Sequence, residues 1–239
     1  MNSGGTNPKI GDCLLISCGS GMKASFIRVL YRPVLNKPVL VEGLPGFGGV
    51  GEEAAHLLID YAKAQLFAEL YSPHFPDYTI VDRSGICNLP RYQFHWAKHD
   101  DVDLIILTGD TQPSPDDLPA HYEVCGLIVD FIREFDCRFI VSLGGMPSST
   151  GKPAICVAAT SPRLVKDVVE DGVAVYRNGM IAGATGLLLG LARIYGIHGI
   201  CLLGAAEKPI GDREAGFRVF HLLTKLLKSD VIKNAIHRS

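Results

Sequence analysis

Apolar stretches about as long as a β-strand alternate with stretches of helical periodicity along most of this chain. Residues 39–43 precede a segment in which apolar residues repeat every three or four positions, over residues 54–66. Residues 102–108 are likewise followed by a helical pattern over residues 118–135. Strands that alternate with helices in this way form a parallel sheet with helices on both faces. We therefore predict a three-layer α/β/α fold with a mainly parallel sheet.

The second half of the chain continues this alternation. Further strand-like runs and helical patterns follow one another, the runs at residues 138–143, 154–159 and 199–203 and the helices at residues 161–170, 184–194 and 212–227. The remaining segment, VIKNAIHRS, is rich in polar residues and is interpreted as a short extension after the last helix. No linker or change of composition divides the chain. These features predict one domain over residues 10–239 after a flexible segment at residues 1–9.

Two segments break the alternation and have the pattern of β-hairpins. In the first, residues 12–18 and 23–31 flank a Gly-Ser-Gly turn. In the second, residues 78–83 and 92–97 flank the sequence GICNLP. Runs of this kind joined by glycine-containing turns are typical of antiparallel pairs. We predict that both hairpins add antiparallel strands to the sheet or to its flanks.

The composition fits a folded protein and excludes several classes of function. Hydrophobic residues make up 47% of the chain and charged residues 20%, which excludes a disordered chain. A formal net charge of −2 gives no overall attraction to nucleic acid or to an anionic membrane. The longest apolar stretch, residues 180–194, contains five small residues and Arg193, which favours a buried helix over a membrane span. The N-terminus lacks the apolar core of a signal peptide, so we expect a cytoplasmic protein.

The cysteine and histidine patterns do not indicate a metal site. The seven cysteines include no C-x-x-C pair and mostly lie in apolar runs, which is typical of reduced core residues. His95 and His99 are four apart in a predicted strand, which puts them on one face but about 13 Å apart, too far to share a metal ion. We expect neither a metal nor a cofactor.

The sharpest local motif is a glycine loop after the first apolar run. Gly46, Gly48 and Gly51 satisfy G-x-G-x-x-G, the pattern of a dinucleotide-binding turn. Glu52 and Glu53 follow in the first turn of the predicted helix, where their carboxylates already satisfy the positive end of the helix dipole and repel a phosphate. The motif therefore favours a turn that lets this helix pack closely on the sheet. Nucleotide binding is the less favoured alternative.

Polar residues and glycines also follow other predicted strands, at the edge of the sheet where ligands of parallel sheets bind. The further candidates for a binding crevice at this edge are Asp110, Gln112, Gly144, Gly145 and Glu207. Their carboxylates and single amide do not form a set of nucleophile, base and oxyanion donors, so they predict no catalytic residue. For each of them, a role in shaping a turn is the alternative.

Four segments, taken in order, resemble the proteasome assembly chaperone family, including its archaeal homologues of the assembly chaperone 2 type. They are EGLPGFGGVGEEAA, DLIILTGDTQP, FIVSLGGMP and GMIAGATGLLLGLARIYGIHGICLLGAA. The resemblance covers about residues 36–227. It implies an α/β domain related in fold to nucleoside phosphorylases, self-association or pairing with paralogues, and a role in assembling proteasome α-subunits.

Two positions depart from the pattern of that family. Gly49 stands where relatives usually have asparagine. The assembly chaperones dock on the α-ring through a C-terminal hydrophobic-Tyr-X tail, whereas this chain ends Ile236-His237-Arg238-Ser239, with Arg238 at the tyrosine position. The sequence leaves open whether docking on the α-ring survives without this tail, and the alternative is a paralogue with a different client.

The residues and the resemblance together predict a protein-binding assembly factor that holds partner subunits non-covalently. We expect proteasome subunits or another protein as partner, and neither nucleic acid nor a membrane. A homo-oligomer is expected because the exposed edges of the hairpins need covering, and because the small side chains in the helix at 182–192 permit close packing. The alternative is a small-ligand-binding protein or an enzyme acting on nucleosides or phosphorylated metabolites at the strand-end crevice. A redox protein that uses its cysteines is the least favoured reading.

Overall fold

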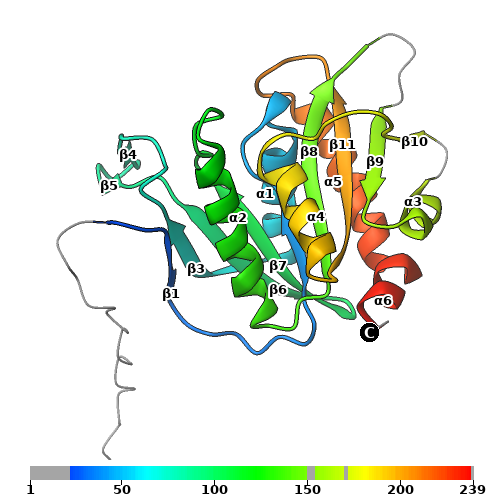
Figure 1. Ribbon diagram of the computed structural model, residues 1–239, viewed down its shortest axis with the longest axis horizontal. Helices are drawn as coiled ribbons and strands as arrows, with labels where there is room; N and C mark the ends of the chain where they lie inside the picture. The colour runs from blue at the N-terminus through cyan, green and yellow to red at the C-terminus, as the bar shows by residue number, and fades with distance from the viewer. Residues whose placement is uncertain (1–21, 150–153, 170–171, 238–239) are drawn as a thin grey trace, which may run out of the picture.

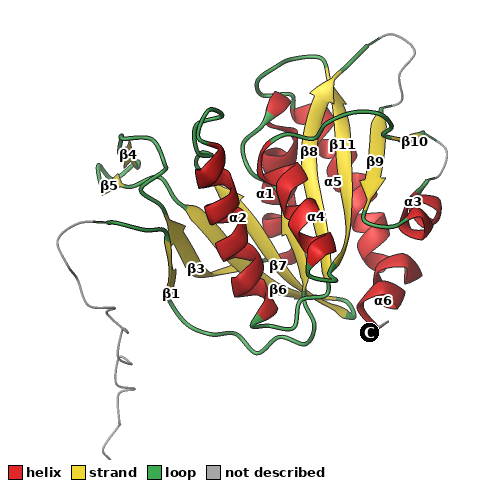
Figure 2. Ribbon diagram, viewed as in Figure 1, coloured by secondary structure: helices red, strands yellow, loops and turns green. Residues whose placement is uncertain are grey.

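The computed structural model describes residues 22–149, 154–169 and 172–237. Nine strands of this part form one mixed sheet in the order β1-β3-β6-β7-β2-β8-β11-β9-β10, and helices cover both of its faces (Figures 1 and 2). The predicted three-layer α/β/α class is confirmed. Its likeness to nucleoside phosphorylases stays a prediction.

The described elements follow one another in this order: β1 (Phe26–Val29), β2 (Val39–Glu42), the 3₁₀ turn η1 (Phe47–Gly49), α1 (Val50–Ala62), β3 (Gln65–Tyr71), β4 (Ile80–Val81), β5 (Cys87–Asn88), β6 (Tyr92–His99), β7 (Val102–Gly109), α2 (Leu118–Arg133), β8 (Phe139–Pro147), β9 (Ile155–Ala159), α3 (Pro162–Val168), β10 (Val173–Val175), α4 (Gly183–Ile194), β11 (His198–Ala206), α5 (Arg213–Lys228) and α6 (Asp230–His237).

The centre of the sheet is parallel and its flanks are largely antiparallel. Strands β7, β2, β8 and β11 run in one direction. On one side, β6, β3 and β1 add antiparallel pairs. On the other side, β9 is antiparallel to β11 and parallel to β10. The predicted mixture of a parallel core with antiparallel additions is therefore present.

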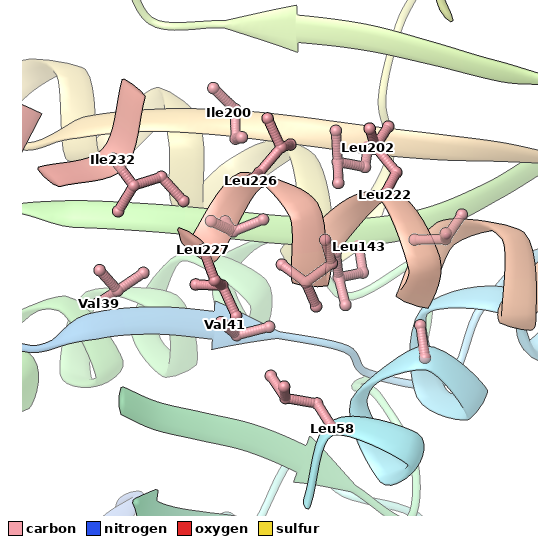
Figure 3. Close-up of a cluster of buried hydrophobic side chains, with 14 of the residues drawn as sticks. Val39, Val41, Leu58, Leu143, Ile200, Leu202, Leu222, Leu226, Leu227 and Ile232 are labelled. Atoms are coloured by element: carbon pink, nitrogen blue, oxygen red, sulfur yellow. The ribbon is translucent and has the colours of Figure 1, made fainter. Parts of the chain in front are cut away.

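The central strands are apolar throughout because both of their faces are buried. In β2, Val39 and Val41 pack against α1, α5 and α6, whereas Leu40 packs on the side of α2 and α4. Figure 3 shows the first of these two cores, where Leu226 and Ile232 of the C-terminal helices lie over the sheet. Strands covered on both faces appear as continuous apolar runs, which is why the sequence shows them so clearly.

The second core joins the antiparallel flank of the sheet to α2. Phe67 of β3 and Phe94 of β6 pack against Phe131 of α2, with ring centroids 4.9 to 6.3 Å apart. Phe135 packs against Phe67 and Phe131 at 5.7 and 5.4 Å. Edge and offset contacts between rings at these distances stabilise a core beyond the area they bury.

The second predicted hairpin is wrong in its pairing. Residues 78–83 were expected to pair with residues 92–97. Instead, β4 pairs with β5 in a separate two-stranded sheet, and β6 pairs with β3 and β7. The turn between β6 and β7 passes through Asp100, which has φ of 50°. Aspartate tolerates the left-handed conformation better than most residues, so this turn joins β6 to the run that follows it.

Only the second half of the first predicted hairpin lies among the described residues, because residues 12–18 fall outside them. Its second half contains β1, which pairs antiparallel with β3. Strand β3 itself was not expected, since the helical pattern over residues 54–66 continues beyond the end of α1. The helix ends at Ala62, and Lys63 takes a left-handed φ of 51°. Pairing with β1 and β6 outweighs the helical spacing of residues 65 and 66.

The last segment is also different from its prediction as a polar extension. It forms α6, in which Ile232, Ala235 and Ile236 are buried in the same core as α5. Their spacing of three and four residues gives α6 one apolar face. The chain is therefore packed against the domain through Ile236, while Arg238 lies outside the described residues. Among the described helices, none has the length and apolar character needed to cross a membrane.

Candidate functional site

The carboxyl ends of the parallel strands β7, β2, β8 and β11 meet at one edge of the sheet, at the top of Figure 1. The loops at residues 43–49, 110–117 and 207–212 leave from this edge. All eight candidate residues lie at or near it. Gly144 and Gly145 are not in a turn as expected, because β8 continues to Pro147.

The glycine loop serves close packing between backbone segments. A methyl group at Gly51 would collide with the carbonyl oxygen of Leu143, and one at Gly145 would collide with that of Phe47. Glycine at these two positions lets α1 and its preceding loop lie directly on β8. This agrees with the packing role favoured by the sequence.

The backbone of this loop is engaged with neighbouring protein groups. Gly48 and Gly49 have φ of 70° and 65°, a conformation that glycine adopts without steric cost. The amide of Gly48 donates to the Pro209 carbonyl at 2.8 Å, and the amide of Gly49 donates to the Gly46 carbonyl at 3.0 Å. A phosphate at a helix N-terminus needs such amides free. The loop therefore gives little support to nucleotide binding, consistent with the two glutamates in the first turn of α1.

Gln112 ties three parts of the edge together. Its Oε1 accepts from the backbone amide of Ala184 at 3.0 Å, and its Nε2 donates to the carbonyl of Pro45. Helix α4 has Ala182 at its N-cap, which offers no side-chain acceptor. Gln112 therefore supplies from a distant loop the hydrogen bond that a capping residue would normally provide.

Asp110 and Glu207 follow β7 and β11, which are three strand spacings apart, or about 14 Å at ~4.8 Å per strand. That these two residues face one crevice stays a prediction. Asp110 is exposed and joined to Arg91, since the Asp110 amide donates to the Arg91 carbonyl and the Arg91 amide donates to Asp110 Oδ2, each at 3.1 Å. Asp110 therefore closes the end of the β6–β7 pair.

Glu207 begins a loop that is organised by Asp212. The Oδ2 atom of Asp212 accepts from the amides of Glu207 and Lys208 at 2.8 and 3.4 Å, while its Oδ1 accepts from the Ala215 amide at 3.0 Å. These bonds hold the pKa of Asp212 below its usual value, with the bond from Ala215 as the largest cause. The sequence marked Asp212 as a helix start but not as the residue that fixes the loop.

A buried carboxylate beneath this edge was missed by the sequence analysis. Glu42, the last residue of β2, is fully buried. Its Oε1 accepts from the Leu44 amide at 3.1 Å and from the Thr185 hydroxyl at 3.4 Å, and its Oε2 has no hydrogen-bond partner within the described part of the chain. Burial raises the pKa of Glu42 from 4.5 to about 7. A carboxylate that ends the otherwise apolar run VLVE is the signal that could have identified it.

The buried cysteines do not favour the redox alternative. Burial raises the pKa of the Cys125 and Cys137 thiols to about 12, and it also raises that of Cys201. A reactive cysteine needs a lowered pKa, because the thiolate is the nucleophile. Cys87 is the exposed cysteine among those described. No group of three or more metal-binding side chains occurs in the described residues.

An open pocket of about 480 Å³ lies at the opposite edge of the sheet. It is lined by residues from the start of β11, the start of α3 and α6, among them His198, Ser161 and Asn234. None of the candidate residues lines it. The predicted strand-end site and this pocket are therefore separate features.

The fold and the edge define an α/β protein whose strand-end loops are bonded mainly to one another. The chain belongs to the PAC2 family, whose model matches residues 40–235. This confirms the resemblance drawn from the four sequence segments. The structure is similar to that of PbaB from Pyrococcus furiosus, described as an archaeal proteasome activator, with a TM-score of 0.81 and 38% identity over 90% of this chain and 95% of that one.

Two further relatives agree with this assignment. PbaA from Pyrococcus furiosus, described as an archaeal homolog of proteasome-assembly chaperone, has a TM-score of 0.71 at 24% identity, covering 89% of this chain and 87% of its own. At that identity the likeness shows the fold. The uncharacterized protein MJ1210 of Methanocaldococcus jannaschii is 32% identical over 214 residues, which are 84% of this chain and 80% of that protein.

Proposed function

We propose that this chain is a protein-binding assembly factor that acts on the proteasome and holds its subunits by non-covalent contact. The observation that carries the proposal is the 38% identity to PbaB over nearly the whole of both chains. A match of that extent relates entire surfaces and not a single motif. In this role the chain works beside proteasomes in the cytoplasm.

The strand-end edge offers a suitable contact surface. Ile210, in the loop between β11 and α5, exposes 84% of its surface, and Phe47 of the glycine loop exposes 38%. The two loops are joined by the bond from Gly48 to Pro209 and by a bond from the Asp212 amide to the Gly48 carbonyl, both 2.8 Å. Apolar side chains on a fixed backbone lose little conformational freedom when they bind.

The surroundings of Ile210 fit the usual anatomy of a protein interface. Glu207 and Lys208 are exposed next to it and supply a polar rim around an apolar centre. The alternative of a nucleoside or phosphate ligand is less favoured at this edge, because Gln112, Asp212 and the amides of Gly48 and Gly49 are bonded within the protein.

Binding to purified proteasome components tests the proposal. The full-length chain, immobilised through an N-terminal tag, is titrated by biolayer interferometry with the cognate proteasome α-subunit and with assembled 20S particles. We expect saturable binding to at least one of them, weakened at least about tenfold by Ile210→Gln, as for an apolar side chain at the centre of an interface. Val34→Gln is the matched control, because Val34 is 87% exposed in the loop between β1 and β2, away from this edge.

Two results would contradict the proposal. Absence of binding to both components at tens of micromolar would rule out the proteasome as partner. Equal weakening by Ile210→Gln and Val34→Gln would show that binding does not depend on the strand-end edge.

A further inference from the structure

The buried carboxyl group of Glu42 connects two of the elements that form the strand-end edge. Its Oε1 accepts from the Leu44 amide, in the loop at residues 43–49, and from the Thr185 hydroxyl, in the first turn of α4. Gln112 joins the same loop to the same turn through a second pair of hydrogen bonds. Glu42 and Gln112 therefore hold one junction together, and Glu42 is the member of the pair that can change its charge.

The surroundings of this carboxyl group contain buried polar atoms that lack hydrogen bonds. Glu42 Oε2, Ser142 Oγ and Tyr92 Oη have no partner within the described part of the chain. All three side chains are fully buried, and Ser142 lies directly opposite Glu42 in the β2–β8 pair. Buried polar groups that lack a protein partner are usually satisfied by water. Glu42, Ser142 and Tyr92 thus form a polar cluster to which water would bind on entry.

The two segments above the polar cluster contain the glycines that a local movement needs. Helix α4 begins at Gly183, which has φ of 72°, and the mostly exposed segment at residues 176–182 precedes it without helix or strand. In the loop at residues 43–49, Gly48 and Gly49 also have positive φ. Glycine changes its backbone conformation at little steric cost. A displacement of these segments would expose the polar cluster without breaking the sheet.

We infer that Glu42 is a pH-sensitive switch beneath the strand-end edge, in which loss of the carboxyl proton brings water to the polar cluster and loosens the segments above it. A buried charge with one unpartnered oxygen is unfavourable, whereas the neutral carboxyl group is tolerated there. Hydration relieves the cost of the charged form. The inference rests on the proposed function for its consequence, because the loop that loosens carries Phe47 and is bonded to the loop that carries Ile210.

Glu42 is the group of this region that changes its charge near neutral pH. Burial outweighs the hydrogen-bonding groups around the carboxylate and raises the pKa of Glu42 to about 7. The other titratable groups that face it are Tyr92 of β6, Cys125 of α2 and Cys201 of β11. Burial raises the pKa of each of these three side chains above its usual value, so they stay neutral where Glu42 ionises.

The sign and size of the effect follow from the closed and the hydrated state of Glu42. In the closed state the carboxyl group keeps its proton up to about pH 7, whereas a hydrated glutamate loses it near pH 4.5. Opening is therefore unaffected below about pH 4.5, becomes easier as the pH rises and levels off above about 7. From pH 5 to pH 8 the equilibrium constant for opening should rise by up to about 70-fold, the limit for complete hydration.

The test is amide hydrogen exchange of the purified full-length chain, measured by mass spectrometry from about pH 5 to pH 8 with no proteasome present. The exchange rate of each wild-type peptide is divided by the rate in Glu42→Gln at the same pH, which cancels the intrinsic pH dependence of exchange. For peptides covering residues 43–49 and 183–187 this ratio should rise at least about tenfold over that range. These peptides should also exchange faster than the core of α5, which opens with the whole chain.

Gln112→Ala is the matched control, because it removes the other connection between the same two segments without changing a charge. It should speed exchange of the same peptides by one factor at every pH. If Glu42→Gln does not fold, the wild type and Gln112→Ala still test the inference. The protection of residues 183–187, relative to the intrinsic exchange rate, should then fall by the same factor in both chains as the pH rises.

Two results would overturn the inference without touching the proposed function. One is a ratio for residues 43–49 and 183–187 that stays within about twofold from pH 5 to pH 8. The other is exchange of these peptides only at the slow rate of the α5 core, which would show that Glu42 acts through unfolding of the whole chain. A chain that shows the expected exchange but binds no proteasome component would instead contradict the proposed function alone.

Discussion

Replacing Glu42 with glutamine should remove a pH dependence of folding stability that a buried carboxyl group imposes. Burial raises the pKa of Glu42 in the folded chain to about 7, compared with 4.5 for an exposed glutamate. Between these values the folded state holds a proton that the unfolded state has lost. The stabilisation of the folded state by this bound proton is therefore fully present below about pH 4.5, and it disappears as the pH rises through about 7.

The size of the effect follows from these two pKa values. Their difference corresponds to about 3 kcal/mol, at ~1.36 kcal/mol for each pH unit. Since the unfolded chain already loses part of its proton at pH 5, about 2.5 kcal/mol of this should change between pH 5 and pH 8. Solvent does not screen this effect, because Glu42 is fully buried.

Urea unfolding at several pH values measures this directly. Trp96 is the only tryptophan and its Nε1 donates to the Tyr31 hydroxyl at 2.8 Å, so its fluorescence reports on the native packing. The unfolding free energy of the wild type minus that of Glu42→Gln should fall by about 2.5 kcal/mol from pH 5 to pH 8. Taking this difference cancels the titration of other groups. A flat difference for Glu42→Gln, within ~0.5 kcal/mol, would refute the reasoning.

Three further predictions concern stability and ligand binding. Gly51→Ala should destabilise the chain by about 3 kcal/mol, because the added methyl meets the backbone of β8. Gly126→Ala should instead stabilise it by about 0.5 kcal/mol, because the added methyl meets nothing and alanine is the better helix former. Chemical denaturation distinguishes the two. Asp212→Ala should cost about 1 to 2 kcal/mol through loss of the α5 cap, and Gln112→Ala about 1 kcal/mol through loss of the α4 cap, both measured by the same assay. Nucleosides, nucleotides and phosphate should leave the melting temperature unchanged in a thermal-shift assay, although a ligand at ~100 times its Kd would add about 2.7 kcal/mol.

The parallel centre of the sheet could be predicted because its strands are buried on both sides. The run VDLIILT and the run RFIVSL are apolar regardless of which face a residue points to, and the helices between them have a clear apolar stripe. The antiparallel flank was harder to predict. Strand β3 continues the helical spacing of α1, and only the left-handed turn at Lys63 together with pairing to β1 and β6 makes it a strand. Such pairing is a tertiary effect that local periodicity does not contain.

The candidate site could be predicted in position but not in its bonding. The sequence placed the glycine loop, Asp110, Gln112 and Glu207 at the carboxyl ends of the strands, and all of them lie there. It could not show that Gln112 caps a helix that begins about 70 residues later, because the acceptor and the donor meet only in the fold. It also passed over Glu42, since a single carboxylate at the end of a strand is normally a solvent-exposed turn residue.

The hydrogen bonds at this edge bear on how it recognises a partner. A G-x-G-x-x-G loop binds anions when its amides point outward and the following helix is free of acidic residues in its first turn. In this chain the amides of Gly48 and Gly49 donate to carbonyl groups, and Asp212 accepts from the neighbouring loop. The amides of Gly48 and Gly49, two of the donors that could recognise a phosphate, are thus already used to fix the loops in place. The fixed loops expose Ile210 and Phe47 beside the charged residues Glu207 and Lys208, so under the proposed function recognition at this edge depends on apolar shape with a polar rim. Such a surface supports the proposed function, in which the partner is another protein.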